Sequence, residues 1–428
     1  MTTLNRDQFI STLGRLVALA RSLQNSAATG KIPCERLAAE VVLSRLGPHI
    51  DAGALHAEIV ANPAHPDRTN LILTLPGSTD ESIGFVGAHF DVVPADRGAE
   101  GWTTDPFSLL VENDGTLRGR GVTDCLGHVA LLTELLRALL DEGIRPRRTI
   151  HVVMIANEEE SNIVNIGFDY LVGLERLNPL KKGPVFWLDS ADFGPTLGTG
   201  GIATWELVAE GVPGHSGMPH NCVNALELGM TAALDLARWF SLAYPPHPDE
   251  ARWRYQSSSS LKSTVVDCDN QKITMIPGVA RIRGDIRLTP FYDMASAIEQ
   301  AVARVVAIDG EIAAGHAEWA RFRTREGKHG SVRLVPPANH NAGMACRLDS
   351  PGYVALSDAI RRVRGEAGMQ PSSMTGSLPL VRTLQDQGFD IQITGFGRGI
   401  AYHAPNEFGM LKDFEDGFAV LCELIERL

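Results

Sequence analysis

The chain has 428 residues, of which 44% are hydrophobic and 21% are charged. A single hydrophobic core stops growing at roughly 250–300 residues, so we expect two domains. The net charge of −12 argues against nucleic acid or an anionic membrane as the main partner. No apolar run approaches the ~18 residues that a membrane span needs. The N-terminus has no signal pattern and the six cysteines lack metal-knuckle or redox spacing, so we expect a cytoplasmic protein with reduced thiols.

The first part of the chain has the pattern of an α/β protein. Helical spacing of apolar residues predicts helices at 7–24 and 35–46. Short apolar runs and one further helix then follow in this order: 71–75, 83–88, 128–140 (the helix), 150–156 and 185–188. Buried strands that alternate with helices predict a layered, mixed sheet with a substantial parallel component.

The pattern changes near the glycine-rich stretch 198–201 and changes back after the proline pair at 336–337. Between them we predict a strand (204–209), a helix (222–242), a strand (281–288), a helix (292–308) and further strands near 316–335. A helix (350–366), a strand (389–393) and a last helix (413–428) resume the first pattern. The predicted organisation is a catalytic domain of residues 1–203 and 341–428 with a smaller α+β domain, residues 204–340, inserted in it.

Polar residues follow several of the predicted strands, where ligands of open α/β sheets gather. His89 stands at the first such strand end, and Asp91 lies two residues further on an extended chain, so both side chains point to the same side. Such a His can bind a metal while the carboxylate orients its ring. For a motif this short the alternative is a structural His that caps the strand.

Two further signals are carboxylates. Asp124 follows a glycine-rich turn at the entrance of the predicted helix 128–140, where it either caps the helix or bridges two cations. Glu158, Glu159 and Glu160 follow an apolar strand, and three adjacent carboxylates repel one another unless a metal or a proton offsets their charge. A solvated loop would tolerate them and remains the alternative.

Asp189, after the predicted strand 185–188, and His403, near the C-terminus, complete the set. Two imidazoles and three carboxylates suit two zinc-like ions that share one carboxylate, and the oxygen ligands also tolerate Co²⁺ or Mn²⁺. The expected metal ligands are His89, Asp124, Glu159, Asp189 and His403. No Gly-x-Ser-x-Gly motif indicates a serine nucleophile instead.

These motifs stand in the order found in the metal-dependent aminoacylase and carboxypeptidase family, which includes acetylornithine deacetylase, succinyl-diaminopimelate desuccinylase and glutamate carboxypeptidase. The chain resembles this family over nearly its whole length. The matching stretches are His89–Asp91, Gly119–Gly127, Asn157–Glu159, Gly214–Gly217, Asn224–Ala225, 276–287 and His403–Glu407. Two positions depart from the broader family, with Leu126 where many relatives have Lys and Thr274 where Asn is usual.

The resemblance implies that His89 and Asp189 hold one metal and that Glu159 and His403 hold the other, with Asp124 as the bridge. Asp91 supports His89. Glu158 is the general base that takes a proton from the attacking water and passes it to the leaving amine. If the register is displaced by one residue, Glu159 is the base and Glu160 the ligand.

The resemblance also implies that the inserted domain is a lid through which the protein forms a homodimer. His215 on the lid then reaches the partner subunit's active site and stabilises the oxyanion, and Arg287 pairs with the substrate carboxylate. Gly376 and Ser377 lie in another matching stretch and are expected to bind substrate. For His215 and Arg287 the alternatives are a surface His and a strand Arg that is paired to Asp285.

Within the family the chain is most similar to a plant-like branch of acetylornithine deacetylases. The implied reaction is hydrolysis of N2-acetyl-L-ornithine to ornithine and acetate, a step of arginine biosynthesis. The alternatives are the same chemistry on another N-acyl amino acid or on a dipeptide, and a catalytically inactive relative that only binds such molecules. The sequence leaves the acyl group and the identity of the metal open.

Overall fold

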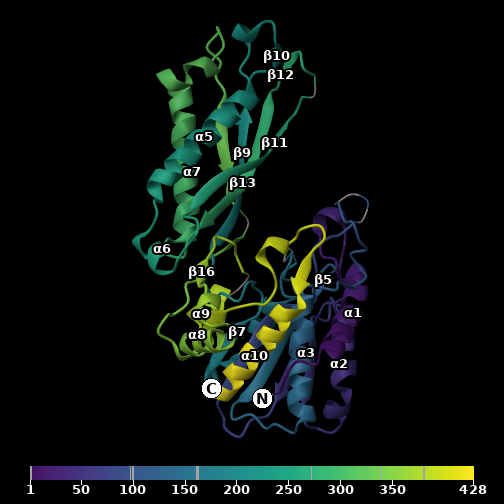
Figure 1. Ribbon diagram of the computed structural model, residues 1–428. Helices are drawn as coiled ribbons and strands as arrows, with labels where there is room; N and C mark the ends of the chain where they lie inside the picture. The colour runs from purple at the N-terminus through teal and green to yellow at the C-terminus, as the bar shows by residue number, and fades with distance from the viewer. Residues whose placement is uncertain are drawn as a thin grey trace. The chain divides into compact units, whose positions relative to one another are not determined.

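The computed structural model describes residues 2–96, 98, 101–160, 163–270, 272–337, 339–378 and 381–428. The chain forms two compact units (Figure 1). The first comprises Met1–Leu197, Cys346–Ser372 and Thr383–Leu428. The second comprises Gly198–Ala345 together with Ser373–Arg382. Each unit has its own hydrophobic core.

The first unit is built on an eight-stranded mixed sheet, in the order β1-β2-β6-β3-β7-β17-β8-β16. The strands are β1 (His56–Ala61), β2 (Thr69–Leu75), β3 (Ser82–His89), β6 (Thr149–Ile155), β7 (Pro184–Trp187), β8 (Thr196–Gly198), β16 (Ser372–Ser373) and β17 (Asp390–Ile393). The four central strands, β6, β3, β7 and β17, run parallel to one another. Their carboxyl ends therefore meet at one edge of the sheet.

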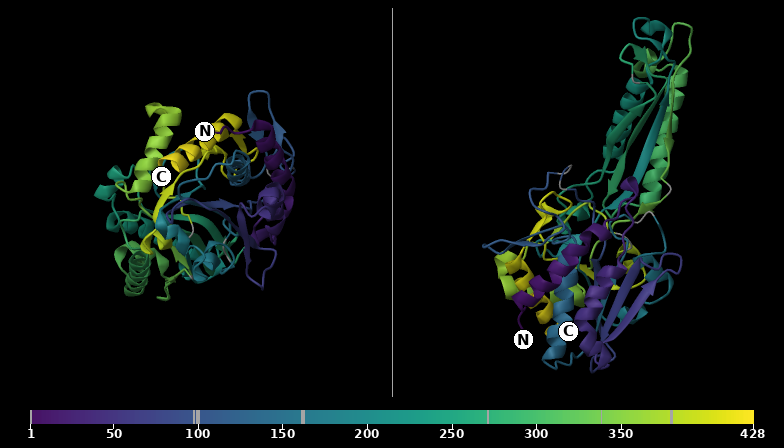
Figure 2. Two further views of the ribbon diagram at one scale, coloured as in Figure 1. Left: turned by 90° about the horizontal axis from the view of Figure 1, so that it is seen from below. Right: turned by 90° about the vertical axis from the view of Figure 1, so that its right-hand side faces the viewer.

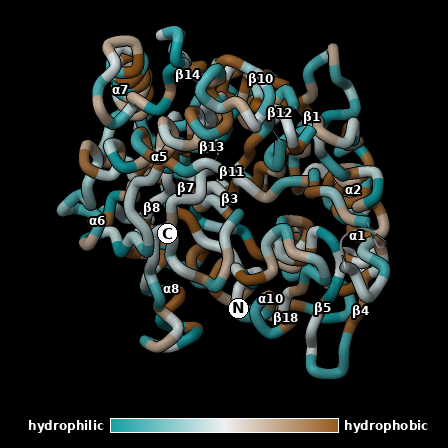
Figure 3. Tube along the Cα trace, turned by 90° about the horizontal axis from the view of Figure 1, so that it is seen from above, coloured by the Kyte–Doolittle hydropathy of each residue, from teal (hydrophilic) through white to brown (hydrophobic). Residues whose placement is uncertain are grey.

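Helices cover this sheet, and several lie side by side (Figure 1). The helices of the first unit are α1 (Arg6–Leu23), α2 (Arg36–Asp51), α3 (Leu126–Asp141), α4 (Phe168–Gly173), α8 (Pro351–Arg364), α9 (Val381–Asp386) and α10 (Leu411–Arg427). Of these, α3 is buried over most of its length, because α1, α2 and α10 pack around it. A small sheet of β18 (Phe408–Met410), β5 (Thr116–Arg118) and β4 (Leu110–Val111) lies apart from the large one, and the turn between β4 and β5 is hydrophilic (Figure 3).

The second unit is a five-stranded antiparallel sheet with two long helices against one face (Figures 1 and 2). The sheet contains β11 (Ser260–Cys268), β13 (Val279–Leu288), β9 (Gly201–Glu210), β14 (Ser331–Val335) and β15 (His340–Asn341). The other elements are α5 (Ala225–Ala243), α6 (Pro248–Arg252), α7 (Met294–Ala314) and a short pair of β10 (Gly214–His215) and β12 (Met275–Ile276).

Local sequence explains the elements of the second unit. Alternate residues of β13 are buried, which is the period of a strand with one covered face. The trace of α7 is largely hydrophobic (Figure 3). The Asp293 carboxylate caps its start by accepting the N–H of Ser296 at 2.7 Å, and Gly315 ends it in the left-handed conformation. No helix in the described part of the chain has the length and apolarity to cross a bilayer.

The expected layered α/β fold with a mixed sheet and an inserted smaller unit is confirmed. Two details of the sequence reading were incomplete. Between residues 316 and 335 only β14 is a strand, since Ala317–Phe322 is a 3-10 helix. The strands β1 and β11 were missed, because each has a single buried residue and gives no regular apolar signal.

Candidate metal centre

The carboxyl edge of the parallel strands collects the polar side chains that the sequence analysis singled out. His89 is the last residue of β3, Glu158 and Glu159 follow β6, and Asp189 follows β7. Because β3 lies between β6 and β7 and runs parallel to both, these residues emerge side by side. The sheet topology therefore brings together side chains that are far apart in the sequence.

His89 is fully buried and faces two carboxylates. Its Nδ1 lies 2.9 Å from the carbonyl oxygen of Asp91, which accepts its proton, so the lone pair of Nε2 points the other way. Nε2 lies 2.9 Å from Oδ1 of Asp124 and 3.9 Å from Oδ1 of Asp189. A backbone carbonyl on one ring nitrogen and a converging lone pair on the other are the arrangement of a metal-ligating His.

His403 approaches the same carboxylate from the C-terminal part of the chain. Its Nε2 lies 3.1 Å from Oδ2 of Asp124 and 3.1 Å from Oε2 of Glu159. Asp124 therefore presents one oxygen to each of the two imidazoles. The hydrogen bonds to Asp124 and Glu159 raise the pKa of His403 to about 10.

The carboxylates of the site are buried close to one another. Burial, reinforced by the charge of Asp124, raises the pKa of Glu159 to about 8. Burial likewise raises the pKa of Asp189 to about 7, with Asp124 contributing again. These shifts mean that the two imidazoles do not fully offset the charges of Glu159 and Asp189. Bound divalent cations would offset the repulsion, and a set of carboxylate oxygens and imidazole nitrogens fits such ions.

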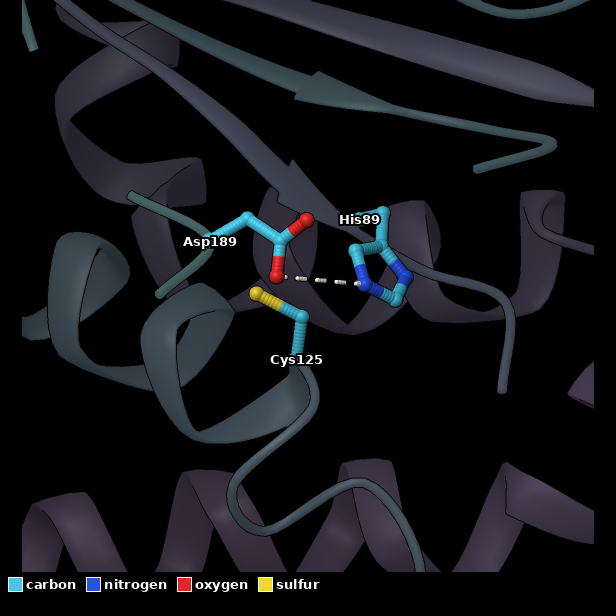
Figure 4. A group of neighbouring side chains, drawn as sticks. All are labelled: His89, Cys125 and Asp189. Atoms are coloured by element: carbon cyan, nitrogen blue, oxygen red, sulfur yellow. Dashed lines mark ion pairs between the residues drawn. The ribbon is translucent and has the colours of Figure 1, made fainter. Parts of the chain in front are cut away.

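One residue that the sequence analysis did not assign also faces the site. Ligand atoms of His89, Cys125 and Asp189 lie within 4.8 Å of one another, and Figure 4 shows the three side chains pointing toward a common centre. The Cys125 thiol donates to the carbonyl oxygen of Leu188 at 3.4 Å. Its position directly after Asp124 is the signal that could have identified it. A second set within 4.8 Å, His89 with Asp124 and Glu159, matches three of the expected ligands.

Asp91 connects the His89 segment to the glutamate loop. Its Oδ1 accepts the backbone N–H of Glu158 at 3.1 Å, and its Oδ2 accepts the backbone N–H of Glu159 at 3.1 Å. Oδ1 is 3.5 Å from Nδ1 of His89, further than the carbonyl oxygen of the same residue. The carboxylate of Asp91 thus holds the loop, and its carbonyl holds the ring.

Two of the three consecutive glutamates, Glu159 and Glu160, contact different parts of the chain. The carboxylate of Glu159 contacts His403 and accepts the backbone N–H of Val93 at 3.1 Å. The carboxylate of Glu160 accepts the backbone N–H of Ala27. Burial, and then the charge of Asp189, raises the pKa of Glu158 well above its usual value.

Glu407 fixes the loop that carries Asp124. This carboxylate is fully buried and accepts four hydrogen bonds, from the guanidinium of Arg120 at 2.8 Å and from the backbone N–H groups of Gly121, Thr123 and Asp124 at 3.0, 2.7 and 3.0 Å. The sequence analysis placed Glu407 in a motif with His403 and gave it no role. Its partners lie more than 280 residues earlier in the chain, so no local signal could reveal them.

The other expected site residues lie in the second unit. His215 is exposed, and its Nδ1 accepts the N–H of Gly217 at 3.0 Å. Arg287 donates to the carboxylate of Asp285 at 2.7 Å. The carbonyl oxygen of Gly376 accepts the N–H of Gly200 at 2.7 Å, and Ser377 is partly buried.

Comparison with known proteins shows what this chain is similar to. The profile of peptidase family M20/M25/M40 matches residues 85–427. An acetylornithine deacetylase of Dictyostelium discoideum is 42% identical over 99% of this chain and 97% of its own length. An acetylornithine deacetylase of Arabidopsis thaliana is 40% identical over 100% of this chain and 96% of its own length.

Solved structures share the fold at much lower identity. Human carnosine dipeptidase 1 superposes with a TM-score of 0.69 at 20% identity and covers 98% of this chain and 95% of its own. An M20 family metallo-carboxypeptidase of Sulfolobus solfataricus gives a TM-score of 0.69 at 18% identity, covering 98% of this chain and 99% of its own. With a profile match over most of its length and two relatives that are 42% and 40% identical, the chain belongs to peptidase family M20/M25/M40.

Proposed function

We propose that this protein is a metal-dependent amidohydrolase that cleaves N2-acetyl-L-ornithine to ornithine and acetate. The observation that carries the proposal is the cluster of His89, Asp124, Glu159, Asp189 and His403 at one sheet edge. The substrate follows from the two relatives named acetylornithine deacetylase, which match the chain from end to end.

The proposed cofactors are two divalent ions, Zn²⁺ first, with Co²⁺ or Mn²⁺ as substitutes. His89 and Asp189 hold one ion, and His403 and Glu159 hold the other. Asp124 serves both, in keeping with its two oxygens facing one imidazole each. Ions at these ligands polarise the amide carbonyl and lower the pKa of water.

Glu158 is the proposed general base. It accepts a proton from the attacking water and delivers that proton to the amide nitrogen, which leaves as the amine. Its raised pKa supports this role, because a carboxylate must bind the proton firmly enough to carry it. The contacts of Glu159 with His403 and of Glu160 with Ala27 favour Glu158 as the base over the register displaced by one residue.

The second unit is the proposed lid and dimerisation domain. There His215 serves the partner subunit's active site, Arg287 pairs with the substrate carboxylate, and Gly376 and Ser377 complete the substrate contacts. For Arg287 this means that the substrate carboxylate replaces or joins Asp285. The strand β11 is at the edge of its sheet and has Val265 and Val266 about half exposed, which supports a self-association surface.

We also propose that the enzyme works in the cytoplasm, in arginine biosynthesis, on a small molecule. Nucleic acid and membranes are not its proposed partners, and the net charge of −12 supports this assignment. Light scattering at assay concentration tests the homodimer. A strict monomer there would contradict it.

A substrate panel and one variant test the proposal together. Acetylornithine should be cleaved faster than acetylcitrulline, acetylmethionine or succinyl-diaminopimelate, and a last place for acetylornithine would reject the substrate assignment. Glu158→Ala should lower kcat by about 10²–10⁴-fold, with two metal ions per chain still bound. Activity that survives this change would refute the assigned base.

A further inference from the structure

A buried ion pair contacts Asn157, the residue that precedes Glu158 and Glu159. The guanidinium Nε of Arg68, just before β2, lies 2.8 and 2.7 Å from the two carboxylate oxygens of Glu35, just before α2. Arg68 is 4% exposed and Glu35 is 0% exposed. Burying two charges is costly, and well-packed apolar side chains often serve stability as well. Stability alone therefore does not explain why these two charges are buried.

The pair holds one residue, Asn157, from both sides. Nη2 of Arg68 donates to Oδ1 of Asn157 at 2.8 Å, and the backbone N–H of Asn157 donates to Oε1 of Glu35 at 3.3 Å. The Asn157 amide group also donates to the carbonyl oxygen of Ile163 at 3.0 Å. Asn157 has a φ of +60°, a conformation that needs outside contacts to persist in a residue other than glycine.

Asn157 immediately precedes Glu158 and Glu159, so its conformation sets the direction in which both leave β6. A second connection closes the network, since Nδ2 of Asn25 donates to Oδ2 of Asp91 at 2.9 Å and to Oδ1 of Asn157 at 3.3 Å. Asp91 in turn accepts the N–H groups of Glu158 and Glu159. The loop is thus held at two places, through the contacts of Asn157 and through the hydrogen bonds to Asp91.

We propose that Arg68 and Glu35 are positioning residues that, through Asn157, fix the orientation of Glu158 and Glu159. This inference rests on the proposed function, in which Glu158 moves the proton and Glu159 binds a metal ion. Neither Arg68 nor Glu35 touches the metal ligands in the described contacts, and neither lies in the motifs that identify the family. Loss of the pair should therefore alter proton transfer and metal affinity while leaving substrate affinity largely unchanged.

Two variants test this positioning role. Arg68→Lys keeps a charge opposite Glu35, but its shorter side chain lacks the planar fork with which Arg68 donates from Nε to Glu35 and from Nη2 to Asn157. Asn157→Gly removes the contacted side chain and retains a backbone that adopts φ of +60° without strain, so it remains informative if the first variant fails to fold. For both we expect kcat at saturating zinc to fall about tenfold or more, as for other residues that orient metal ligands, with KM within about threefold.

The matched control is Arg45→Lys. Arg45 pairs with another buried carboxylate, Glu134, at 2.8 Å, and the pair lies between α2 and α3 rather than behind the site. This variant should lose thermal stability without losing kcat. Zinc affinity, measured by competition with a chelator, supplies a readout that needs no substrate, and we expect it to fall about tenfold only in the two test variants.

A fall in kcat or in zinc affinity that Arg45→Lys does not share supports the proposal. It is overturned if both quantities stay within about twofold of the wild-type values in Arg68→Lys and Asn157→Gly, or if the control loses as much. If the wild-type protein cleaves another N-acyl amino acid instead of acetylornithine, kcat is measured on that substrate. If it cleaves none, the proposed function fails, and the zinc affinities alone decide the positioning role.

Discussion

Two regions of the first unit that bury carboxylates differ in the direction in which they shift the pKa of these groups. On α3, Glu134 is 2% exposed and accepts hydrogen bonds from Arg45, Arg137 and the hydroxyl of Thr12. Burial acts to raise its pKa, but these donors together lower it below the usual value. At the carboxyl edge of the sheet, burial raises the pKa of Glu159 to about 8 and of Asp189 to about 7.

The difference lies in the compensating charge. Arg45 and Arg137 supply the cations beside Glu134, so the charge of this carboxylate is offset as soon as the chain folds. We therefore assign Glu134 a structural role. Glu159 contacts His403 and the backbone N–H of Val93, and Asp189 lies 3.9 Å from His89, yet the pKa values of both acids stay raised. Burial of an acid is therefore not by itself a sign of function. The sign is burial that the neighbouring groups of the chain do not offset, so that the pKa of the acid stays raised.

The largest effect is expected when Asp124, the carboxylate that faces both imidazoles, is removed. Asp124→Ala should abolish binding of the metal ions and lower kcat by more than about a thousandfold, because Lewis-acid stabilisation worth several kcal/mol is lost. Metal analysis after dialysis and a kinetic assay check this. Full activity with fewer than one ion per chain would show that the buried acids serve another purpose.

The opposite result is expected at the self-compensated site. Glu134→Ala removes the carboxylate that Arg45 and Arg137 share, leaves Arg137 only Asp141, and should lower the free energy of unfolding by about 3 kcal/mol. The number of metal ions per chain should stay as in the wild-type protein. Urea denaturation with metal analysis measures both, and a loss of metal from this variant would blur the distinction between the two regions.

His128 is a buried imidazole, and its protonation also tests whether this part of the chain can offset a buried charge. Burial lowers the pKa of His128 to about 4, and its Nε2 accepts the N–H of Phe396 at 2.8 Å, so the ring is neutral in the folded state. Between pH 6.5 and 4 the unfolded chain binds a proton that the folded ring refuses, so the stability falls as the pH falls. The loss approaches about 3 kcal/mol at pH 4.

The measurement compares urea denaturation of the wild-type protein and His128→Asn across this pH range, in a chelator so that metal release does not contribute. The variant should show a correspondingly weaker dependence on pH. An equal dependence of the free energy of unfolding on pH in the two proteins would mean that the His128 ring becomes charged in the folded state. The residues around His128 would then offset a buried charge.

The smallest effect is expected for an ion pair at the surface. Arg283 and Asp267 pair across β13 and β11 with side chains about half exposed. Arg283→Gln should change the free energy of unfolding by less than about 0.5 kcal/mol, because solvent and salt screen the interaction. Thermal denaturation at low and at high salt checks this, and a loss as large as that of Glu134→Ala would mean that exposure does not separate the two kinds of pair.

The parallel strands and the polar residues at their ends could be predicted from the amino-acid sequence. Apolar runs of strand length that alternate with helices can be recognised locally, and a sheet of parallel strands then places His89, Glu159 and Asp189 at one edge. The ordered motifs supplied Asp124 and His403, which no local periodicity would have brought to the same place.

Which buried charges are compensated follows from the three-dimensional packing. Glu407 reaches the Asp124 loop across more than 280 residues, and Arg68 reaches Asn157 across 89. The exposed strand β11 also became visible only through its pairing with β13. Hydrogen bonds between distant segments depend on how the layers pack. Local residue patterns do not show which distant segments come into contact. The pattern of strand ends could be read from the sequence, whereas the contacts that hold those ends in place could not.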